Sequence, residues 1–443
     1  MQKKYDVIIA GAGPAGLMTA QVLGEKGARV LLLDIKKDIA RVYRACCANL
    51  IIEPDTHREL TTYAGGAFHF AENKFSIPYS GAIIELKRSV KISAGGNTLI
   101  FTGKSPEGNV ALSFDKEILL QGMLAKVSAC STIDIMPETQ ALRAENTAGG
   151  VAVTLRSGGR EFIAGSRIAV AADGVNSSIV ESLGLNKTQR TFFARFMVAS
   201  YHMEGVDCPY PKSWITFMGK GHTLGGRGQL YMCPKPHGGS TDTVYELSVG
   251  VPALGPPAPS AQQELDHFIN KGNFASWFKH ARIIETRAAA LNFATPLIHP
   301  VEGNVVVVGD AGAFIETYVQ GAIMYGYQAA RAIAQQLATG SGLDAYARSW
   351  ENSFEYNDPE EIKLATQGFG LHVLEDDDIN YLFSLTEGDD IRGFVNEFSE
   401  PETVSTALFN HMAQIERQRP DLAAKLKRFS EVSVAEALQI GSD

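Results

Sequence analysis

The sequence predicts an α/β protein: a sheet of parallel strands flanked by helices, with an inserted β-rich unit and a helical C-terminal region. Three observations support this fold class. Residues 5–34 have the pattern of a strand, a glycine-rich turn, a helix and a second strand. Two short apolar runs far along the chain each end in an Asp/Gly pair. Residues 190–295 alternate apolar with polar side chains between prolines and glycines.

Composition restricts the classes of function. The chain of 443 residues has 40 Lys and Arg against 49 Asp and Glu, a formal net charge of −9, whereas nucleic-acid binding needs a basic surface. Five cysteines without a C-x-x-C pair fit neither a disulfide framework nor a zinc site, and the ten histidines show no metal-ligand spacing. We therefore expect no nucleic-acid partner, no metal, and a reducing compartment.

The apolar run near the N-terminus differs from a signal peptide and from a membrane span. Ala10 to Ala20 is interrupted by three glycines and a proline, and no other stretch reaches about 18 uninterrupted apolar residues. We expect a cytoplasmic protein without an integral membrane segment, and a peripheral contact with a membrane stays open.

The first strand and helix are joined by the turn Gly11-Ala12-Gly13-Pro14-Ala15-Gly16. In this G-x-G-x-x-G pattern the first glycine permits a tight turn, the second lets the backbone approach a pyrophosphate, and the third allows close packing of helix on sheet. The helix N-terminus then offers unpaired N–H groups to the phosphates. The residues of this turn are therefore predicted to bind a dinucleotide: Gly11, Gly13, Pro14, Ala15 and Gly16.

Asp34 completes this unit at the end of the second strand, 18 residues after Gly16. At this position a carboxylate accepts a hydrogen bond from the adenosine ribose, and it disfavours a 2′-phosphate. The turn alone does not distinguish NAD from FAD.

The two distant Asp/Gly segments distinguish FAD from NAD as the predicted cofactor. Ala171-Ala172-Asp173-Gly174 and Val308-Gly309-Asp310-Ala311-Gly312 each follow a short buried strand. Together with the first turn they resemble the three signatures of the FAD-binding family that includes aromatic hydroxylases, geranylgeranyl reductases and flavin halogenases, over nearly the whole chain. The resemblance implies FAD as cofactor, a Rossmann-like FAD-binding domain, and Asp310 on the ribityl chain. For Asp173, capping of the turn and contact with the cofactor both stay open.

A helix is expected to begin at Gln320-Gly321-Ala322 and run to Leu337. Its N-terminus would stabilise the negative charge that reduced flavin carries at N1. The family usually has a proline and Gly-Glu-Gly in this loop, where this chain has Thr317 and Gln320-Gly321-Ala322. The role of the loop backbone is compatible with this change, whereas the family's chemistry toward the substrate cannot be inferred from this loop.

Three segments resemble the geranylgeranyl reductase branch of the family. Arg44-Ala45-Cys46-Cys47 lies where those reductases carry a cysteine beside the flavin. Gly228 to Pro234 is similar to their G-Y-x-W-x-F-P substrate motif, with Tyr231 in place of Trp and Cys233 in place of Phe, and residues 343–350 and 374–379 are similar to their helical extension. The W-x-W-x-I-P signature of the halogenases is absent.

The resemblance also implies roles for individual side chains. Cys46 or Cys47 would donate a proton to the substrate or orient it, with packing under the cofactor as the alternative for both. Arg44, with Ala45 beside it, would offset the charge of the pyrophosphate. Lys116, ahead of a helix at Ile118 to Val127, lies where the family often contacts the ribityl chain, although a solvated lysine is equally compatible.

The domain organisation follows from the strand pattern. Residues 167–172 and 304–308 add two strands to the first sheet, residues 145–165 form an antiparallel meander, and a helical stretch is expected at 260–281. The predicted parts are an FAD-binding domain at 1–185 and 297–340, a β-rich substrate domain at 186–296, and a helical C-terminal region at 341–443.

The leading hypothesis is an FAD-dependent oxidoreductase that reduces carbon–carbon double bonds of an apolar substrate, for example a polyprenyl chain, by hydride transfer from flavin N5. The substrate rests on the family resemblance alone. An aromatic monooxygenase that uses O₂ and NAD(P)H is the alternative, and a flavoprotein that carries electrons to a quinone is the third hypothesis. The electron donor, whether NAD(P)H, reduced ferredoxin or a quinol, stays open.

Overall fold

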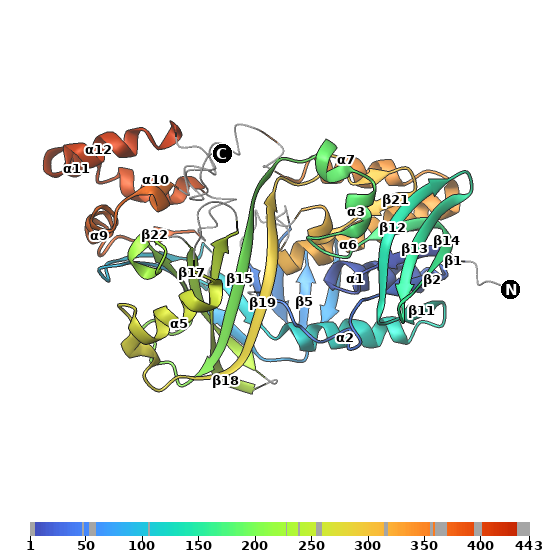
Figure 1. The fold of residues 1–443 in the computed structure, drawn as a ribbon, viewed down its shortest axis with the longest axis horizontal. Coiled ribbons are helices and arrows are strands. Elements are labelled where there is room, and N and C mark those ends of the chain that lie inside the picture. The colour runs from blue at the N-terminus through green and yellow to red at the C-terminus, as the bar shows by residue number, and fades with distance from the viewer. Residues whose placement is uncertain are drawn as a thin grey trace.

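The computed structural model describes residues 5–46, 48–52, 59–104, 107–226, 228–237, 240–253, 259–313, 318–354, 358, 370–393 and 401–431. Figure 1 shows the arrangement of its elements: the sheet that contains the parallel strands at one end, a second large and mostly antiparallel sheet in the middle, and the C-terminal helices α9 to α12 at the other end. The α/β fold class with a β-rich insertion and C-terminal helices is confirmed.

The first sheet, called sheet A here, has eight strands in the order β11-β2-β1-β14-β13-β12, with β21 beside β14 and β20 beside β21. The pairs from β11 to β14 and the pair β14/β21 are parallel, whereas β12, β13 and β14 form the expected antiparallel meander. Its strands are β1 (Tyr5–Ala10), β2 (Val30–Leu33), β11 (Ile133–Met136), β12 (Thr139–Thr147), β13 (Gly150–Ser157), β14 (Arg160–Ala171), β20 (Val301–Glu302) and β21 (Val305–Val307).

Both faces of sheet A are covered, which explains its uninterrupted apolar strands. Val7 and Ile9 pack with the helices α1 (Pro14–Glu25), α2 (Lys116–Ser128) and α6 (Tyr318–Thr339) in one core. Ile8 and Ala10, which point to the other face, pack with the short helices α3 (Ser178–Ser182) and α4 (Leu185–Thr188) in a second core.

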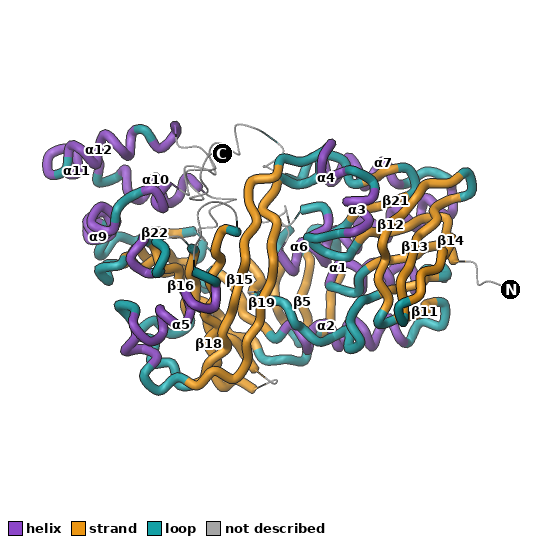
Figure 2. The backbone as a smooth tube through the Cα atoms, in the orientation of Figure 1, coloured by secondary structure: helices purple, strands orange, loops and turns teal. Residues whose placement is uncertain are grey.

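The second large sheet, sheet B, has the strand order β19-β15-β18-β17-β16-β8-β9-β22. Figure 2 shows the long strands β15, β18 and β19, of which β15 pairs with both of the others. The helix α5 (Ala261–Lys271) packs on one face of this sheet in a third core. The strands are β8 (Arg88–Ser93), β9 (Thr98–Thr102), β15 (Phe192–Glu204), β16 (Ser213–Met218), β17 (Gln229–His237), β18 (Ser240–Pro252), β19 (Arg282–Ala294) and β22 (Ile391–Arg392).

Sheet B extends beyond the predicted substrate domain. The range 186–296 supplies β15 to β19, whereas β8 and β9 come from the first part of the chain and β22 from the C-terminal region. The chain therefore enters sheet B three times, and the four predicted domain boundaries stay a prediction.

Two three-stranded sheets lie in the segment between β2 and α2. One has the order β3-β10-β7 and the other β4-β5-β6. Their strands are β3 (Asn49–Ile51), β4 (Thr61–Ala64), β5 (Ala67–Phe70), β6 (Phe75–Pro78), β7 (Ile83–Leu86) and β10 (Ala111–Phe114).

The C-terminal helices pack against the β9 side of sheet B. Leu99 and Phe101 of β9 share a core with Ile379, Leu382 and Phe383 of α9. None of the described helices is long and apolar enough to cross a membrane. The remaining helices are α7 (Leu343–Glu351), α9 (Asp376–Leu385), α10 (Pro401–Phe409), α11 (Met412–Gln418) and α12 (Pro420–Lys427), with 3-10 turns η2 (Lys220–His222), η3 (Ala275–Phe278), η4 (Gly309–Ala311), η6 (Gly370–Val373) and η7 (Phe429–Glu431).

Candidate functional site

A cavity of about 760 Å³ is lined by residues of both large sheets. Its volume falls in the range of small-molecule and cofactor sites, roughly 300–1,000 Å³. Sheet A contributes the ends of its parallel strands, and sheet B contributes β8 and β15 to β19. The cavity brings together most of the predicted site residues: Gly11, Gly13, Pro14, Ala15, Asp34, Arg44, Ala45, Cys46, Lys116, Asp173, Gly174, Tyr231, Asp310 and Ala322.

The three glycines of the first turn are required for different reasons. Gly11 has φ +97°, and a Cβ there would lie 2.2 Å from the carbonyl oxygen of Ala172. A Cβ on Gly16 would lie 1.9 Å from the carbonyl oxygen of Gly11. A Cβ on Gly13 would meet no described atom within 4 Å, because this residue borders the cavity. Protein packing thus demands glycine at the first and third positions, and the second leaves space for a ligand.

Asp34 is almost fully buried and fixes the geometry of the turn. Its Oδ2 accepts a hydrogen bond from the Ala12 N–H at 2.8 Å, and its Oδ1 accepts one from the Lys36 N–H at 2.8 Å. Each carboxylate oxygen has a second lone pair, which leaves Asp34 able to accept from a ribose hydroxyl as well.

Asp173 has one oxygen that holds the turn and one that does not. Its Oδ2 accepts a hydrogen bond from the Ser178 N–H at 3.0 Å. Its Oδ1 is buried without a hydrogen-bond partner in the described part of the chain, and burial raises the pKa of the carboxyl group. A buried polar atom without a partner at the wall of a cavity fits a donor on a bound ligand. The capping role and the cofactor role are therefore compatible.

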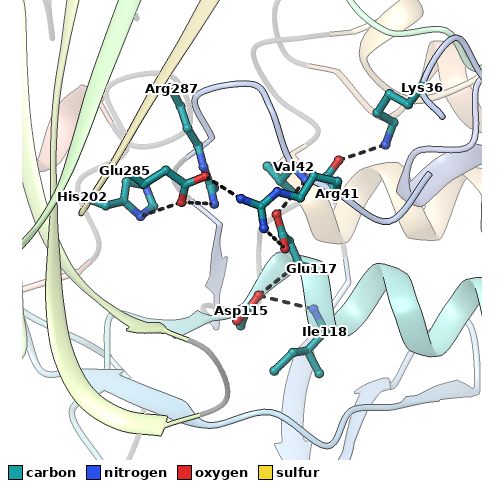
Figure 3. Close-up of polar contacts among 9 residues, drawn as sticks. All are labelled: Lys36, Arg41, Val42, Asp115, Glu117, Ile118, His202, Glu285 and Arg287. Atoms are coloured by element: carbon teal, nitrogen blue, oxygen red, sulfur yellow. Dashed lines mark hydrogen bonds and ion pairs between the residues drawn. The ribbon is translucent and has the colours of Figure 1, made fainter. Parts of the chain in front are cut away.

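The segment 41–46 is clamped between sheet B and α2 (Figure 3). The Arg41 guanidinium contacts Glu117 at 3.1 Å and Glu285 of β19 at 3.4 Å, and the Val42 N–H donates to Glu117 at 2.9 Å. The Ala45 N–H donates to the Ala288 carbonyl of β19 at 3.3 Å. These contacts hold Arg44 and Cys46 at the cavity wall.

Lys116 lies beside Cys46. The Lys116 Nζ donates a hydrogen bond to the Cys46 Sγ at 3.2 Å, and both side chains line the cavity. Lys116 begins α2, whose N-terminus is capped by Asp115 through the Glu117 and Ile118 N–H groups (Figure 3). Cys47, the other predicted thiol, lies outside the described residues.

Several predicted site residues do not line the cavity. The Gln320 side chain accepts from the Ile51 N–H at 2.8 Å and donates to the Ile51 carbonyl at 2.7 Å, so it joins α6 to β3. A Cβ on Gly312 would lie 2.6 Å from the Trp350 ring, which places this glycine under α7. The other predicted residues away from the cavity wall are Gly16, Cys233, Gly309 and Gly321.

The cavity has further wall residues that the sequence did not indicate. Sheet B supplies a polar group on β8, β16 and β17, whose alternating side chains face the cavity only once the strands are paired. Alternation within β8 was the available signal, but nothing in its sequence indicated that it pairs with β16, 125 positions later. These residues are Ser89, Lys91, Thr216 and Gln229, together with Lys36, Asn49 of β3 and, from the clamped segment, Arg41.

The residues present fit FAD. The N-terminus of α1 and the open side of Gly13 suit a pyrophosphate, Arg44 supplies a cation, and Asp173 supplies an acceptor oxygen. No group of three or more His, Cys, Asp or Glu side chains within the described residues is arranged to hold a metal ion.

Comparison with known proteins gives the family. Residues 4–315 match the protein family described as FAD binding domain. The chain is 24% identical over 367 residues to digeranylgeranylglycerophospholipid reductase 1 of Methanococcoides burtonii, covering 80% of this chain and 81% of that protein. It is 25% identical over 395 residues to the digeranylgeranylglycerophospholipid reductase of Methanococcus vannielii, covering 86% and 90%.

Solved structures share the fold. A geranylgeranyl bacteriochlorophyll reductase-like protein of Thermoplasma acidophilum aligns with a TM-score of 0.71 at 16% identity, covering 97% of this chain and 100% of that one. The flavin-dependent halogenase CmlS aligns with a TM-score of 0.58 at 16% identity, covering 99% and 77%. The chain belongs to the FAD binding domain family, its cofactor is FAD, and it is an FAD-dependent oxidoreductase of the geranylgeranyl reductase-like type.

Proposed function

We propose that this oxidoreductase reduces carbon–carbon double bonds of an apolar substrate, such as a polyprenyl chain, with electrons from an external donor. The supporting observation is that one cavity is lined both by the FAD-binding turns and by apolar side chains of sheet B. The relatives named as digeranylgeranylglycerophospholipid reductases support the same class of substrate. The apolar side chains from sheet B are Phe196, Val198, Leu230, Leu291 and Phe293.

Reduction of an alkene needs a hydride at one carbon and a proton at the other. Bound reduced FAD supplies the hydride from its N5 position. The chain's own residues bind and orient: Arg44 and the N-terminus of α1 hold the pyrophosphate, and Asp34 and Asp310 accept from hydroxyl groups. Cys46, held by Lys116 at 3.2 Å, orients the alkene or provides the proton.

The test compares the mass of the product formed without oxygen with the mass of the product formed in air. The holoenzyme is reduced chemically without oxygen and mixed with a geranylgeranyl lipid, and the same reaction is run in air. We expect the product to gain two hydrogens per reduced bond in both cases. Strict dependence on O₂ with incorporation of an oxygen atom would overturn the proposal in favour of a monooxygenase, and reoxidation of the flavin by quinones but by no alkene would indicate an electron carrier.

A further inference from the structure

A buried charged cluster lies directly behind the cavity wall on sheet B. It consists of Tyr231 and Lys235 of β17, Glu246 of β18 and Asn49 of β3, and we call it the Glu246 cluster. Cys233 pairs with Glu246 across the two strands, and side chains two residues apart share a face. Tyr231, Lys235 and Glu246 therefore lie on one face of sheet B, the face that Tyr231 presents to the cavity.

The contacts within the cluster form a chain that starts at the cavity. The Tyr231 hydroxyl lies 3.4 Å from Glu246 Oε1. The Lys235 Nζ lies 3.8 Å from Glu246 Oε2 and donates a hydrogen bond to Asn49 Oδ1 at 2.7 Å. Asn49 lines the cavity as well, three residues after Cys46. The carboxyl group of Glu246 is thus connected to the cavity directly through the Tyr231 phenol and, less directly, through Lys235 and Asn49.

Burial of these charged groups costs free energy, and stability alone does not explain it. Glu246 is 0% exposed and Lys235 is 3% exposed, and Glu246 Oε2 has no hydrogen-bond partner within the described residues. A buried ion pair with incomplete hydrogen bonding is weak support for stability, because desolvation of both charges offsets their attraction. A buried carboxyl group next to a ligand cavity is instead typical of proton transfer.

The charges around Glu246 allow its carboxyl group to exchange a proton. Desolvation raises the pKa of Glu246, while Lys235 and Arg287 act in the opposite direction. The Arg287 charge is partly balanced by Glu285 at 2.8 Å. His202 on β15 is kept neutral, because burial lowers its pKa to about 3, and the pKa of Cys233 is raised to about 11 by burial. Of the titratable groups around the Tyr231 hydroxyl, the Glu246 carboxyl group is therefore the one suited to resupply its proton.

We infer that Tyr231 donates the proton in the proposed alkene reduction and that Glu246 restores it. Reduced FAD, when bound, would supply the hydride for one alkene carbon, and with it both electrons of the reduction. As the second carbon gains its C–H bond, the Tyr231 O–H bond breaks, and the proton of Glu246 moves to the phenolate oxygen. The resulting carboxylate faces the Lys235 ammonium group and regains a proton from solvent before the next turnover. Cys46 and Lys116 then orient the substrate.

This inference rests on the proposed function, and its test separates the two. The holoenzyme is reduced with dithionite, mixed with a geranylgeranyl lipid without oxygen, and the rate of flavin reoxidation is followed from pH 5 to pH 9 in H₂O and D₂O. If the wild type is not reoxidised by any alkene, the proposed function fails. If it is reoxidised, the variants Tyr231→Phe and Glu246→Gln test the proton path.

We expect Tyr231→Phe to slow reoxidation by roughly 10²-fold or more, because general acid catalysis contributes about 10²–10⁴-fold. A wild-type rate that requires protonated Glu246 falls as pH rises through its pKa, and Glu246→Gln should remove this decline. The solvent isotope effect, which arises from the Tyr231 O–H bond, should be lost in Tyr231→Phe. Glu246→Asp should restore part of the rate. FAD binding and the rate of reduction by dithionite should stay within about twofold in every variant.

Matched substitutions away from the cluster serve as controls. Tyr210→Phe changes a side chain that packs against the core on the other face of sheet B. Glu204→Gln removes an exposed ion pair with Arg282. Both should leave the pH profile and isotope effect unchanged. The inference is wrong if Tyr231→Phe retains the wild-type isotope effect and Glu246→Gln retains the wild-type pH profile. Loss of both in Cys46→Ala would identify the thiol as the proton donor.

Discussion

At the scale of single residues, the hydrogen bond from Lys116 to Cys46 defines the thiol's position. The ammonium group reaches the sulfur at 3.2 Å from the first turn of α2, and both groups face the cavity. A thiol that merely packs under a cofactor does not need a cation as its neighbour. The contact therefore favours a role for Cys46 in the orientation of substrate.

We predict that replacing Cys46 and Cys47 together by Ala abolishes turnover while FAD stays bound. The physical reason is loss of the side chain that Lys116 holds against the substrate, without loss of any contact from the glycine turn. Flavin content and alkene reduction are the measurements. The control is Cys130→Ala, at a cysteine just beyond the C-terminal end of α2. Full activity in the double variant would show that both thiols only contribute to packing.

We expect different effects on stability when Gly13 and Gly16 are each replaced by Ala. At Gly16 the new Cβ meets the Gly11 carbonyl at 1.9 Å, so we expect a loss of roughly 3 kcal/mol in the free energy of unfolding. At Gly13, where φ is −76° and the Cβ meets no described atom within 4 Å, unfolding of the protein without FAD should change by less than about 0.5 kcal/mol.

The Gly13→Ala variant should instead bind FAD at least about tenfold more weakly, because its methyl group occupies the space of the pyrophosphate. Thermal unfolding without FAD and titration of flavin fluorescence measure the two effects. Equal loss of stability in both variants would contradict the assignment of Gly13 to the ligand.

Much of the site could be predicted because its residues belong to local patterns. Gly11 and Asp34 are recognised from spacing within one strand–turn–helix–strand unit, and both line the cavity. Lys91 and Asn49 could not be predicted, since their place at the wall depends on pairing with strands far away in the sequence. Gln320 was assigned to the cofactor from its place in the loop, and only the fold reveals its bonds to Ile51.

At the scale of elements, Gln320 links α6 to the edge strand β3. Its amide supplies the acceptor and donor that the Ile51 N–H and carbonyl would otherwise lack, and it is 2% exposed. We predict that Gln320→Leu lowers the free energy of unfolding by about 2 kcal/mol or more, because two buried backbone groups lose their partners. Denaturant unfolding measures this effect, with Gln335→Leu on the exposed side of α6 as control. Equal stability of the two variants would show that water replaces the amide.

The elements themselves were predictable to different degrees. Sheet A follows from apolar runs, which are continuous because helices cover both faces, and the strands near 7–10, 29–33, 167–172 and 304–308 are confirmed. The strands between residues 49 and 114 have only three to six residues each, too few for their periodicity to stand out. The alternation over residues 190–295 correctly indicated the strands β15 to β19 of sheet B, but the inclusion of β8 and β9 depends on long-range pairing.

At the scale of the whole molecule, sheet B is linked to α2, a helix that packs on sheet A, by the ion pairs of Arg41 with Glu285 and Glu117 (Figure 3). The Arg41 side chain is 47% exposed, and pairs of this kind contribute only about 0–1 kcal/mol each. Their role is therefore to set the position of the segment 41–46 against β19. A larger effect on stability is expected from the group buried at the inner end of this network.

His202 lies at that inner end, 5% exposed and 4.0 Å from Glu285. Burial lowers its pKa from 6.5 to about 3, so the folded protein keeps it neutral while the unfolded chain protonates it near pH 6.5. Below that pH the unfolded state binds the extra proton, and stability falls as pH decreases from 6.5 toward 3. His222, also buried, has a pKa lowered in the same direction.

We predict that the wild-type protein loses about 2 kcal/mol of unfolding free energy from His202 alone between pH 8 and pH 5, at about 1.4 kcal/mol per pH unit well below 6.5. His202→Asn should flatten this dependence, whereas His280→Asn, at an exposed position outside the network, should preserve the wild-type slope. The measurement is the thermal midpoint at fixed FAD concentration from pH 8 to pH 5. Because the substitution removes a titrating group, the stability of His202→Asn relative to wild type must rise as pH falls. A constant offset between His202→Asn and wild type at every pH would mean that packing, and not protonation, is how this histidine affects stability.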